Sequence, residues 1–451
     1  MSYDPLSERP TNRRRLVFCL ASATSFLLYL HRYTWNLIRP ELEAEYGFTN
    51  TQLEALGTAF YATYALGSIP SGIVIDLFGP HLFLFAIILV WSIIVPLQAV
   101  TGNVFALGSI RMLFGAAQTG TYPALGNVTR IWFPRARRTM VQGWVASFFG
   151  RGGGACSSVI MGTLLMGYLG LSWRMALVAM AIPGAIFAVL FLIVFRNSPE
   201  EDPHANQAER ELIQGDERTG TETRGVIPVR KALKNFSLRV MVFQQFLNAG
   251  SDVVYTLVMG SFFLSRGVAD MKELGWLVSL PLIGGALGGI MGGFLNDRLI
   301  RRVGSRWGRS LVGFFGKTLA AASLYIAITQ PTAAQVAYGL FLVKFFTDWS
   351  QPTVWGTCTD IGGRFSATVF SAINMAGNTG ALVMPLVFGP LLDYFKTEQT
   401  VAGELVVVTN FTPMFVLVGL MYVGAGILWL LVDCTRRIED EIDTDAVEAV
   451  S

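Results

Sequence analysis

Apolar stretches of helix length follow one another along most of the chain. A helix needs about 20 mostly apolar residues to cross the hydrocarbon core of a bilayer, and the sequence offers twelve stretches of that kind. Pairs that usually end helices, such as Arg39-Pro40 and Gly79-Pro80, lie between neighbouring stretches. The pattern therefore predicts membrane-spanning helices at about 16–38, 51–75, 80–100, 104–128, 138–167, 171–195, 238–265, 272–296, 309–329, 332–357, 365–392 and 410–433.

A long polar interval divides the twelve predicted helices into two sets of six. The loop after the second helix contains Asp76 in the sequence Gly-Ile-Val-Ile-Asp-Leu-Phe-Gly, and the loop after the eighth echoes it around Asp297 and Arg298. A parallel repeat of six helices is typical of transporters in which one half rocks against the other around a central site. We therefore predict a six-helix bundle at 1–196, a cytoplasmic linker at 197–237, a second bundle at 238–435 and an acidic tail at 436–451.

The composition excludes an ordinary soluble protein. Of the 451 residues, 52% are hydrophobic and 14% are charged, whereas soluble domains carry roughly 25% charged residues. The sequence has three histidines and four scattered cysteines, and it lacks both a nucleophile with a nearby base and a glycine-rich phosphate loop. We therefore expect no enzyme, and no cofactor, metal or nucleic-acid partner.

The positions of the Lys and Arg residues predict how the chain crosses the membrane. Cytoplasmic segments are enriched in these residues. If the N-terminus is cytoplasmic, 24 of the 34 Lys and Arg residues fall on the cytoplasmic side. Five fall on the opposite side: Arg39, Arg174, Arg266, Lys272 and Lys396. We therefore predict a multi-pass protein of the cell (inner) membrane, in contact with lipid and with both termini in the cytoplasm.

The remaining basic residues lie inside the predicted helices: Arg32, Arg111, Arg151, Lys317 and Lys344. A charge near the centre of a bilayer costs from about 2.5 to above 10 kcal/mol, so it usually faces inward and is paired. Arg32 and Arg111 are candidates to clamp a carboxylate, because a guanidinium forms bidentate hydrogen bonds with it. Against these five cations stand Asp252 and Asp348, so the helices keep an excess of positive charge and an anionic substrate is predicted.

Motifs on several predicted helices occur in an order shared with a known family. The matching segments are Leu30-His31-Arg32 followed by Arg39-Pro40, Arg111 to Pro123 with Gly115, Gln118 and Tyr122, Trp132-Phe133-Pro134 before a basic loop, Gly275 to Pro281 before Asn296-Asp297-Arg298, and Asn374 with Asn378. Over nearly its whole length the sequence resembles the major facilitator superfamily and, within it, the anion:cation symporter family. The resemblance implies an all-α membrane protein with twelve transmembrane helices in two six-helix bundles, which carries organic anions such as sugar acids and other carboxylates.

Two positions depart from that family. Its proton-coupled members have an acid beside the arginine of the first helix and a glutamate on the fourth, where this chain has His31 and Gln118. Glutamine cannot take up a proton, whereas an unperturbed histidine titrates near pH 6.5. Asp252 precedes Asp297 by the same 45 residues that separate His31 from Asp76, so it occupies the equivalent place in the second half. His31 and Asp252 are therefore the candidates to couple transport to a cation.

Lys344 on the tenth helix corresponds to Arg111 on the fourth. Asp348 follows Lys344 by four residues, so the two can pair along one helix face. For Asp252 two interpretations stay open: a proton or cation site, or a buried ion-pair partner of Lys344 or Arg32.

Other side chains are candidates to line the site. Arg151 lies in a run of glycines, 150–154, whose lack of bulk leaves room for a substrate or for a partner carboxylate. Hydroxyl and amide groups can contact substrate hydroxyls. The candidate substrate-binding residues are Arg32, Arg111, Tyr29, Tyr33, Tyr64, Gln118, Tyr122, Tyr255, Asn374, Asn378, Lys344 and Arg151. The superfamily resemblance implies that Asp76, Asp297 and Arg298 act in gating.

The predicted function is secondary active transport of a small organic anion, a sugar acid or another carboxylate, by alternating access in a monomer. A proton or a sodium ion is the expected co-substrate if transport is coupled. Gln118 keeps an alternative open, a proton-independent uniporter or anion exchanger of the same fold. A further alternative is a metabolite sensor that does not transport, but the short tails and linker argue against an output domain.

Overall fold

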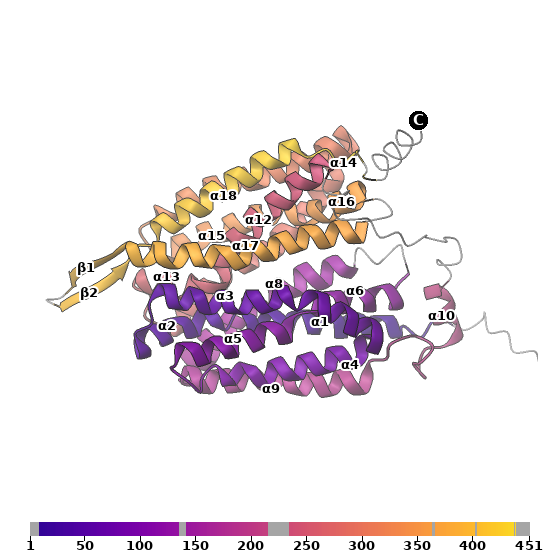
Figure 1. Ribbon diagram of the computed structural model, residues 1–451, viewed down its shortest axis with the longest axis horizontal. Coiled ribbons are helices and arrows are strands. Elements are labelled where there is room, and N and C mark those ends of the chain that lie inside the picture. Colours follow the sequence, from indigo (N-terminus) through magenta and orange to yellow (C-terminus); the bar gives the residue numbers. More distant parts are fainter. Residues whose placement is uncertain are drawn as a thin grey trace, which may run out of the picture.

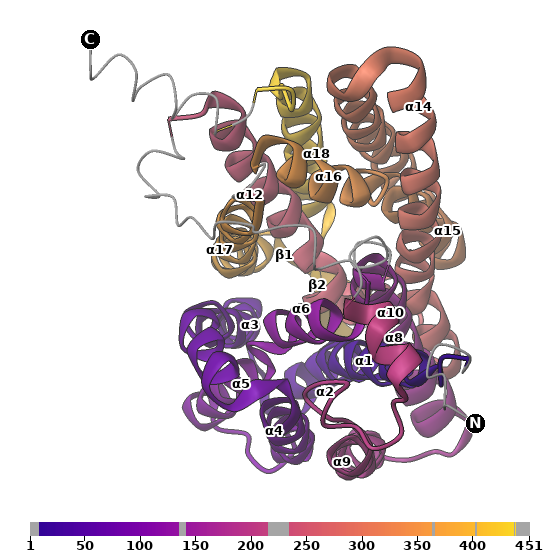
Figure 2. The same ribbon diagram turned by 90° about the vertical axis from the view of Figure 1, so that its right-hand side faces the viewer.

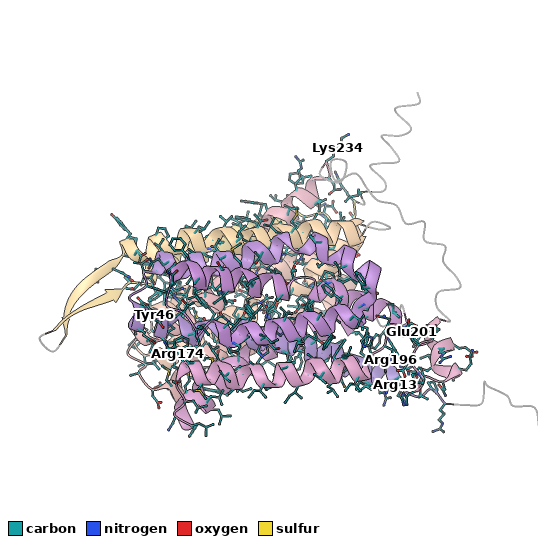
Figure 3. All side chains as sticks on the ribbon, turned by 60° about the horizontal axis from the view of Figure 1, so that its bottom comes forward. Arg13, Tyr46, Arg174, Arg196, Glu201 and Lys234 are labelled. Carbon is teal, nitrogen blue, oxygen red and sulfur yellow. The ribbon has the colours of Figure 1, made fainter. Side chains whose placement is uncertain are left out.

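Two groups of helices lie side by side in the computed structural model, which describes residues 9–134, 141–214, 234–362, 366–401, 404–436 and 438 (Figure 1). We refer to 9–196 as the N-terminal half and to 234–438 as the C-terminal half; Figure 2 shows the first below the second. Helix α10 (Gln207–Gln214) lies at one end of the molecule, termed the α10 end, and a strand pair lies at the other, termed the hairpin end. Arg13 and Glu201 mark the α10 end in Figure 3, whereas Tyr46 and Arg174 mark the hairpin end.

The described part of the N-terminal half is helical, and one section of it, η2 to η3, alternates between π-helix and α-helix. Its elements are α1 (Arg13–Arg32), α2 (Trp35–Tyr46), α3 (Asn50–Leu66), α4 (Ser68–Leu97), α5 (Val104–Gln118), α6 (Thr121–Trp132), η2 (Trp144–Phe149), α8 (Gly150–Ser158), η3 (Val159–Tyr168) and α9 (Trp173–Val194). The short α10 of the linker is tied to the start of α1, since Arg13 pairs with Asp202 at 2.8 Å and the Asn12 N–H donates to Glu209 at 2.9 Å.

The C-terminal half adds a small sheet to its helices, which the predicted all-α fold omits. Its elements are α12 (Phe236–Leu257), α13 (Met259–Ser265), α14 (Met271–Ile328), α15 (Ala333–Thr347), α16 (Ser350–Gly362), α17 (Ser366–Tyr394), β1 (Lys396–Val401), β2 (Glu404–Thr409) and α18 (Thr412–Leu431). Strands β1 and β2 pair antiparallel, with Lys396 opposite Thr409. The apolar pattern predicts only a connection between two helices here, although the Val and Thr residues of this segment favour strands.

Several of the predicted membrane helices are interrupted, among them the first, fourth, seventh and tenth. The first is interrupted after Arg32 and restarts at Trp35, and the fourth is interrupted before α6 at Gly120, whose φ is 74°. In the C-terminal half, the seventh bends by 59° at Val258, and the tenth is interrupted at Asp348. Each break leaves carbonyl groups of a helix end inside the protein rather than at its surface.

The predicted stop at Arg39-Pro40 is wrong. Pro40 lies inside α2, which continues to Tyr46 and ends at Gly47, where φ is 67°. Pro40 is the sixth residue of α2 and has no N–H to donate to the backbone oxygen of Asn36, yet the helix continues past it. The sequence pattern does not reveal that the helix restarts at Trp35 and passes through this proline.

Gly79 and Gly304 mark equivalent turns in the two halves. Their φ values of 73° and 81° lie in the left-handed region that favours glycine. Each follows its repeated aspartate by a few residues, so the repeat in the sequence is also a repeat in the backbone. Of the predicted gating residues, Asp297 and Arg298 are exposed, whereas the Asp76 side chain lies outside the described residues.

Within the described ranges, six helices are long and apolar enough to cross a membrane, or seven if α12 and α13 form one bent span. The sequence predicts twelve spans. Breaks divide the fourth and tenth predicted spans into α5, α6, α15 and α16, of 15, 12, 15 and 13 residues, whereas a continuous span needs about 20. The eighth and ninth predicted spans lie together in the 58-residue α14 and count once.

Hydrogen bonds join the two halves between their middle and the hairpin end. Asn36 of α2 donates to the backbone oxygen of Tyr255 at 2.7 Å. Thr163 of η3 donates to the backbone oxygen of Lys272 at 2.8 Å. Because both acceptors are neutral backbone oxygens, these contacts join the halves without burying further charge.

Arg39 forms a buried ion pair within the N-terminal half and a hydrogen bond to the C-terminal half, although the sequence places it in a loop on the membrane surface. Its guanidinium pairs with Glu54 of α3 and donates to Asn50 at 2.9 Å. It also donates to the backbone oxygen of Leu257 in the other half at 3.1 Å. Glu54, a helix acid that the sequence pattern does not single out, supplies the charge that keeps Arg39 buried.

Asp393 of α17 caps the first turn of α3 from the opposite half. Its carboxylate accepts from the N–H groups of Asn50 at 3.1 Å and Thr51 at 2.8 Å, and from the Thr51 hydroxyl at 2.5 Å. The first N–H groups of a helix have no partner inside the helix and favour a negative charge. The cap therefore holds the two halves together at the hairpin end.

Replacing Asp393 by Ala should loosen the hairpin end. A helix cap stabilises a protein by about 0.5–2 kcal/mol. The ratio of molecules whose halves meet at the hairpin end to molecules whose halves have separated there should therefore fall by about 2- to 30-fold. Spin labels at positions Ala55 and Tyr394, both exposed, would report the change as a longer distance in pulsed electron resonance. Asp270→Ala is the matched control, because Asp270 caps α14 within one half by accepting from the Lys272 N–H at 3.0 Å. Identical distance distributions in the two variants would show that Asp393 does not hold the two halves together.

Candidate functional site

Arg32 lies in the last turn of α1 and has no acidic partner among the described residues. Its Cζ atom lies 4.8 Å from the ring centre of Tyr64 and 5.1 Å from those of Tyr29 and Phe60. Its Nε donates to Gln118 Oε1 at 3.0 Å, whereas its Nη2 is buried and makes no hydrogen bond. Aromatic faces stabilise a desolvated cation, but an unused buried donor costs about 1–3 kcal/mol or more. This side chain is therefore ready to bind an anion.

Gln118, the last residue of α5, holds Arg32 in position. Its amide nitrogen donates to the backbone oxygen of Leu28 at 3.2 Å while its oxygen accepts from Arg32. The interruption after Gln118 brings α6 and Tyr122 next to the same site. Tyr122 is hydrogen-bonded to Ser25 at 3.1 Å and its ring lies 6.5 Å from that of Tyr29. A neutral amide thus occupies the place where an acid would neutralise Arg32.

Arg111 is buried and lies against aromatic rings. Its Cζ atom lies 4.2 Å from the Trp35 ring centre and 5.0 Å from that of Phe60. Nε donates to the backbone oxygen of Leu56 at 3.3 Å, and Nη1 donates to Gln98 at 3.4 Å. The structure thus brings both candidate arginines to Phe60, with neutral groups around Arg111. The sequence does not indicate Phe60 or Gln98, because nothing distinguishes them from ordinary helix residues.

Two of the helix breaks place cations at helix C-termini. Arg32 lies in the last turn of α1, and Lys344 lies in the last turn of α15. The C-terminal end of a helix carries partial negative charge, which stabilises a nearby cation. The break geometry therefore contributes to burying both side chains.

Four charged side chains meet where α8 of the N-terminal half packs against the C-terminal half. Lys344 Nζ lies 2.9 Å from both oxygens of Asp252 and 3.0 Å from Asp348 Oδ1. Arg151 reaches across from α8, with Nε 2.6 Å from Asp348 Oδ2 and Nη2 3.6 Å from Asp252 Oδ2. We call these four residues the quartet. Its two cations and two carboxylates sum to zero charge.

The quartet shows which ion pairs Asp348 and Asp252 make. Asp348 pairs with Lys344, as the four-residue spacing predicts. Asp252 pairs with Lys344 and Arg151, and no contact with Arg32 is described. The partner carboxylates of Arg151 come from the other half, which the sequence alone does not indicate.

Gly285 of α14 leaves the space that the quartet occupies. A Cβ atom at this position would lie 3.2 Å from Arg151 Cδ and 3.3 Å from Lys344 Cε, and it would overlap with Asp348 Oδ2. Any larger residue must therefore displace part of the quartet.

His31 and Lys317 are fully buried away from Arg32. His31 Nε2 is hydrogen-bonded to the backbone oxygen of Met180 on α9 at 2.9 Å. Lys317 Nζ donates to Asn248 and to the backbone oxygen of Thr347, the latter at 3.3 Å. Both side chains thus contact polar groups within their own halves.

The other candidate side chains are more scattered. Tyr33 stacks on Tyr29 with 5.9 Å between ring centres, and the Tyr255 ring centre lies 5.2 Å from Lys344 Nζ. On α17, Asn374 is exposed and Asn378 half-buried, and neither has a described contact with Arg32 or the quartet. The part of the chain that the structure describes holds no group of three His, Cys, Asp or Glu residues suited to a metal.

The sequence is similar to known transporters. Residues 21–385 match the family model of the Major Facilitator Superfamily. A probable sulfoacetate transporter of Cupriavidus necator is 27% identical over 414 residues, 89% of this chain and 94% of that protein. A probable galactarate/D-glucarate transporter of Bacillus subtilis is 24% identical over 415 residues, 87% of this chain and 88% of that protein.

Solved structures share the fold at low sequence identity. A bacterial homologue of the human lysosomal transporter Spinster superposes with a TM-score of 0.71 and 14% identity, covering 93% of this chain and 95% of its own. The nucleoside transporter NupG gives a TM-score of 0.64 and 13% identity, covering 92% of this chain and 98% of its own. At this identity the likeness concerns the fold alone.

Gly285→Ala should destabilise the protein by displacing the quartet. Loss of contacts between buried charges costs several kcal/mol, so thermal unfolding of the purified protein should occur at a lower temperature. Gly289→Ala, one turn along α14, is the control because a Cβ there meets nothing within 4 Å. Alanine favours helix over glycine by about 1 kcal/mol, so the control should unfold at the same or a higher temperature. Equal unfolding temperatures would show that the quartet does not need the space at Gly285.

Proposed function

The chain belongs to the Major Facilitator Superfamily, and from that premise we propose that it carries a small organic anion across the membrane by alternating access of its two halves. It is a multi-pass membrane protein of the bacterial inner-membrane type, and a transporter rather than an enzyme. We further propose that the broken helices complete twelve spans and that both termini are cytoplasmic, since the loops on that side carry most of the Lys and Arg residues.

The observation that carries the proposal is the unpaired guanidinium of Arg32. The N-terminal site holds Arg32 and Arg111 without a described acid, so it has excess positive charge in a medium of low dielectric constant. A carboxylate or sulfonate would balance that charge and engage the buried Nη2 donor. A neutral sugar would leave both cations unbalanced, and a cationic solute would be repelled.

The relatives support an organic anion as the substrate. Two are named as carriers of sulfoacetate and of galactarate or D-glucarate, and each aligns with most of this chain. Sugar acids combine a carboxylate with hydroxyl groups, and the Arg32 site combines a guanidinium with the hydroxyls of Tyr29, Tyr64 and Tyr122. We assign Arg32 as the direct clamp and Arg111 as the source of a background positive potential.

The contacts of Gln118, His31 and Asp252 favour Asp252 as the group that would couple transport to a cation. Gln118 carries no titratable proton, and His31 faces α9 rather than Arg32. Asp252 lies between the halves, and its side chain is 21% exposed. A coupled proton or sodium ion would therefore act at Asp252, and without such an ion the protein would be a uniporter or an exchanger of the same fold.

Removing the Arg32 guanidinium should abolish most transport. A hydrogen bond to a charged group is worth about 1.5–3 kcal/mol, so uptake by Arg32→Ala in proteoliposomes should need about 10- to 150-fold more substrate. Arg32→Lys should be intermediate, because lysine keeps the charge but loses the planar pair of donors. D-glucarate, D-galactarate, sulfoacetate and D-gluconate would be tested as labelled substrates.

Arg174→Ala is the control for this series, since Arg174 pairs with Glu45 at the hairpin end and lies far along the chain from Arg32. Uptake that is unchanged in Arg32→Ala while wild-type protein transports would overturn the clamp.

Gln118→Glu should make substrate affinity depend on pH. A charged glutamate at this position would pair with Arg32 Nε and compete with the substrate anion. The KM for the transported acid should therefore exceed the wild-type value at pH 7.5. As the pH falls, protonation of the glutamate releases Arg32, so the KM should approach the wild-type value. The KM ratio of variant to wild type, measured between pH 5 and 7.5, would be constant if Gln118 were remote from the substrate.

A further inference from the structure

Arg151 and Arg32 are connected by one aromatic wall. The Arg32 guanidinium lies over the Tyr29 ring, and Tyr29 stacks on Tyr33. A Cβ atom at Gly150, next to Arg151, would lie 3.2 Å from the Tyr29 ring, and one at Gly154 would lie 3.1 Å from the Tyr33 ring. The helix that carries Arg151 therefore packs directly on the wall that carries Arg32. Both arginines therefore lie near the Tyr29–Tyr33 pair.

Two side chains of the quartet are partly exposed to solvent and two are buried. The side chains of Lys344 and Asp348 are 0% and 1% exposed, whereas those of Arg151 and Asp252 are 15% and 21% exposed. A guanidinium has five N–H groups, and the described contacts of Arg151 use only those on Nε and Nη2. Nη1 of Arg151 is left for another acceptor.

The contacts of Arg151 are also unequal in strength. Arg151 Nη2 donates to Asp348 Oδ1 at 2.9 Å and Nε lies 2.6 Å from Asp348 Oδ2, whereas the separation from Asp252 is 3.6 Å. Asp252 holds Lys344 through both oxygens at 2.9 Å and does not need Arg151 to remain paired. An incoming anion can therefore displace Asp252 from Arg151 while the contacts of Arg151 with Asp348 persist.

From these contacts we propose that Arg151 is a second anion-binding group, so that the site selects a dianion and takes it up together with a proton on Asp252. This inference rests on the proposed function and narrows its substrate class. One anionic end binds Arg32, and the other binds Nη1 and Nη2 of Arg151 in place of Asp252. A monoanion engages Arg32 alone.

The charge of the quartet is the reason to expect a proton on Asp252 when an anion binds. The four groups sum to zero, so an added anion at Arg151 gives the quartet a net charge of –1, and the loss of its contact with Arg151 makes Asp252 the carboxylate that a proton most readily neutralises. Asp252 is the exposed acid of the four and takes up the proton from solvent; the proton then leaves when the anion leaves. The charged and titratable groups around Asp252 are Lys344 and Asp348 of α15, Arg151 of α8, Lys317 of α14, Tyr255 of α12 and Tyr422 of α18.

The test compares matched acids that differ by one charge. The full-length purified protein would be titrated calorimetrically with D-glucarate and D-gluconate, and with sulfoacetate and acetate. Wild type should bind the dianion of a pair at least tenfold more tightly than the monoanion. Arg151→Gln should remove this preference, so that D-glucarate and D-gluconate bind with similar affinity. A dianion preference that survives in Arg151→Gln overturns the proposal, as does a wild type without the preference.

A second variant distinguishes the loss of an anion-binding group from a folding defect of Arg151→Gln. Arg151→Gln leaves the two carboxylates facing one ammonium, whereas Arg151→Gln with Asp348→Asn removes one charge of each sign and keeps the cluster neutral. The double variant should likewise lose the preference for D-glucarate over D-gluconate. If it retains the preference, Arg151 is not the second anion-binding group.

Calorimetric titrations in two buffers of different ionisation enthalpy measure how many protons the protein takes up when an acid binds. Wild type should take up about one proton with D-glucarate and none with D-gluconate, and Asp252→Asn should take up none with either. Absence of proton uptake by wild type with D-glucarate contradicts the role of Asp252. The two proposals fail differently: Arg32→Ala that binds both acids undiminished contradicts the proposed function, whereas an unchanged preference in Arg151→Gln contradicts only this inference.

Discussion

The high cost of burying a charge inside a membrane protein governs the arrangement of this site. In the C-terminal half and at the interface, the cations of the quartet are balanced by carboxylates within hydrogen-bonding distance. In the N-terminal half, Arg32 and Arg111 are stabilised by aromatic rings, amides and a helix end, all of which are neutral. Such groups make burial tolerable without removing the charge. The remaining imbalance is what gives the protein an affinity for anions.

The broken helices make this arrangement possible. A continuous helix satisfies its own backbone and offers only side chains to its neighbours. Breaks after Arg32, after Gln118, at Val258 and at Asp348 expose helix ends and let the adjoining side chains turn toward the middle of the protein. The breaks lie on two helices of each half, at positions that the internal repeat relates. The same feature leaves the fourth and tenth predicted spans in pieces that are each shorter than a bilayer needs.

Much of the fold follows from the sequence, because it depends on apolar stretches and on glycines with special backbone angles. The turn at Gly79, the pairing of Lys344 with Asp348 and the candidate status of Arg32 could all be predicted from local patterns. The helix breaks, the strand pair and the course of the chain through Arg39-Pro40 could not, because tertiary packing decides them. Contacts between the halves, such as those of Arg151 and Asp393, join residues about 200 to 340 positions apart, and no spacing rule relates such residues.

The central claim is that the unpaired Arg32 guanidinium binds the substrate anion. A structure of the full-length protein determined with a transported acid bound tests this most directly. The account predicts an anionic group of that acid within about 3 Å of Arg32 Nη2, between the rings of Tyr29 and Tyr64. An acid bound away from Arg32, or an Arg32 paired with a carboxylate of the protein itself, would contradict the account.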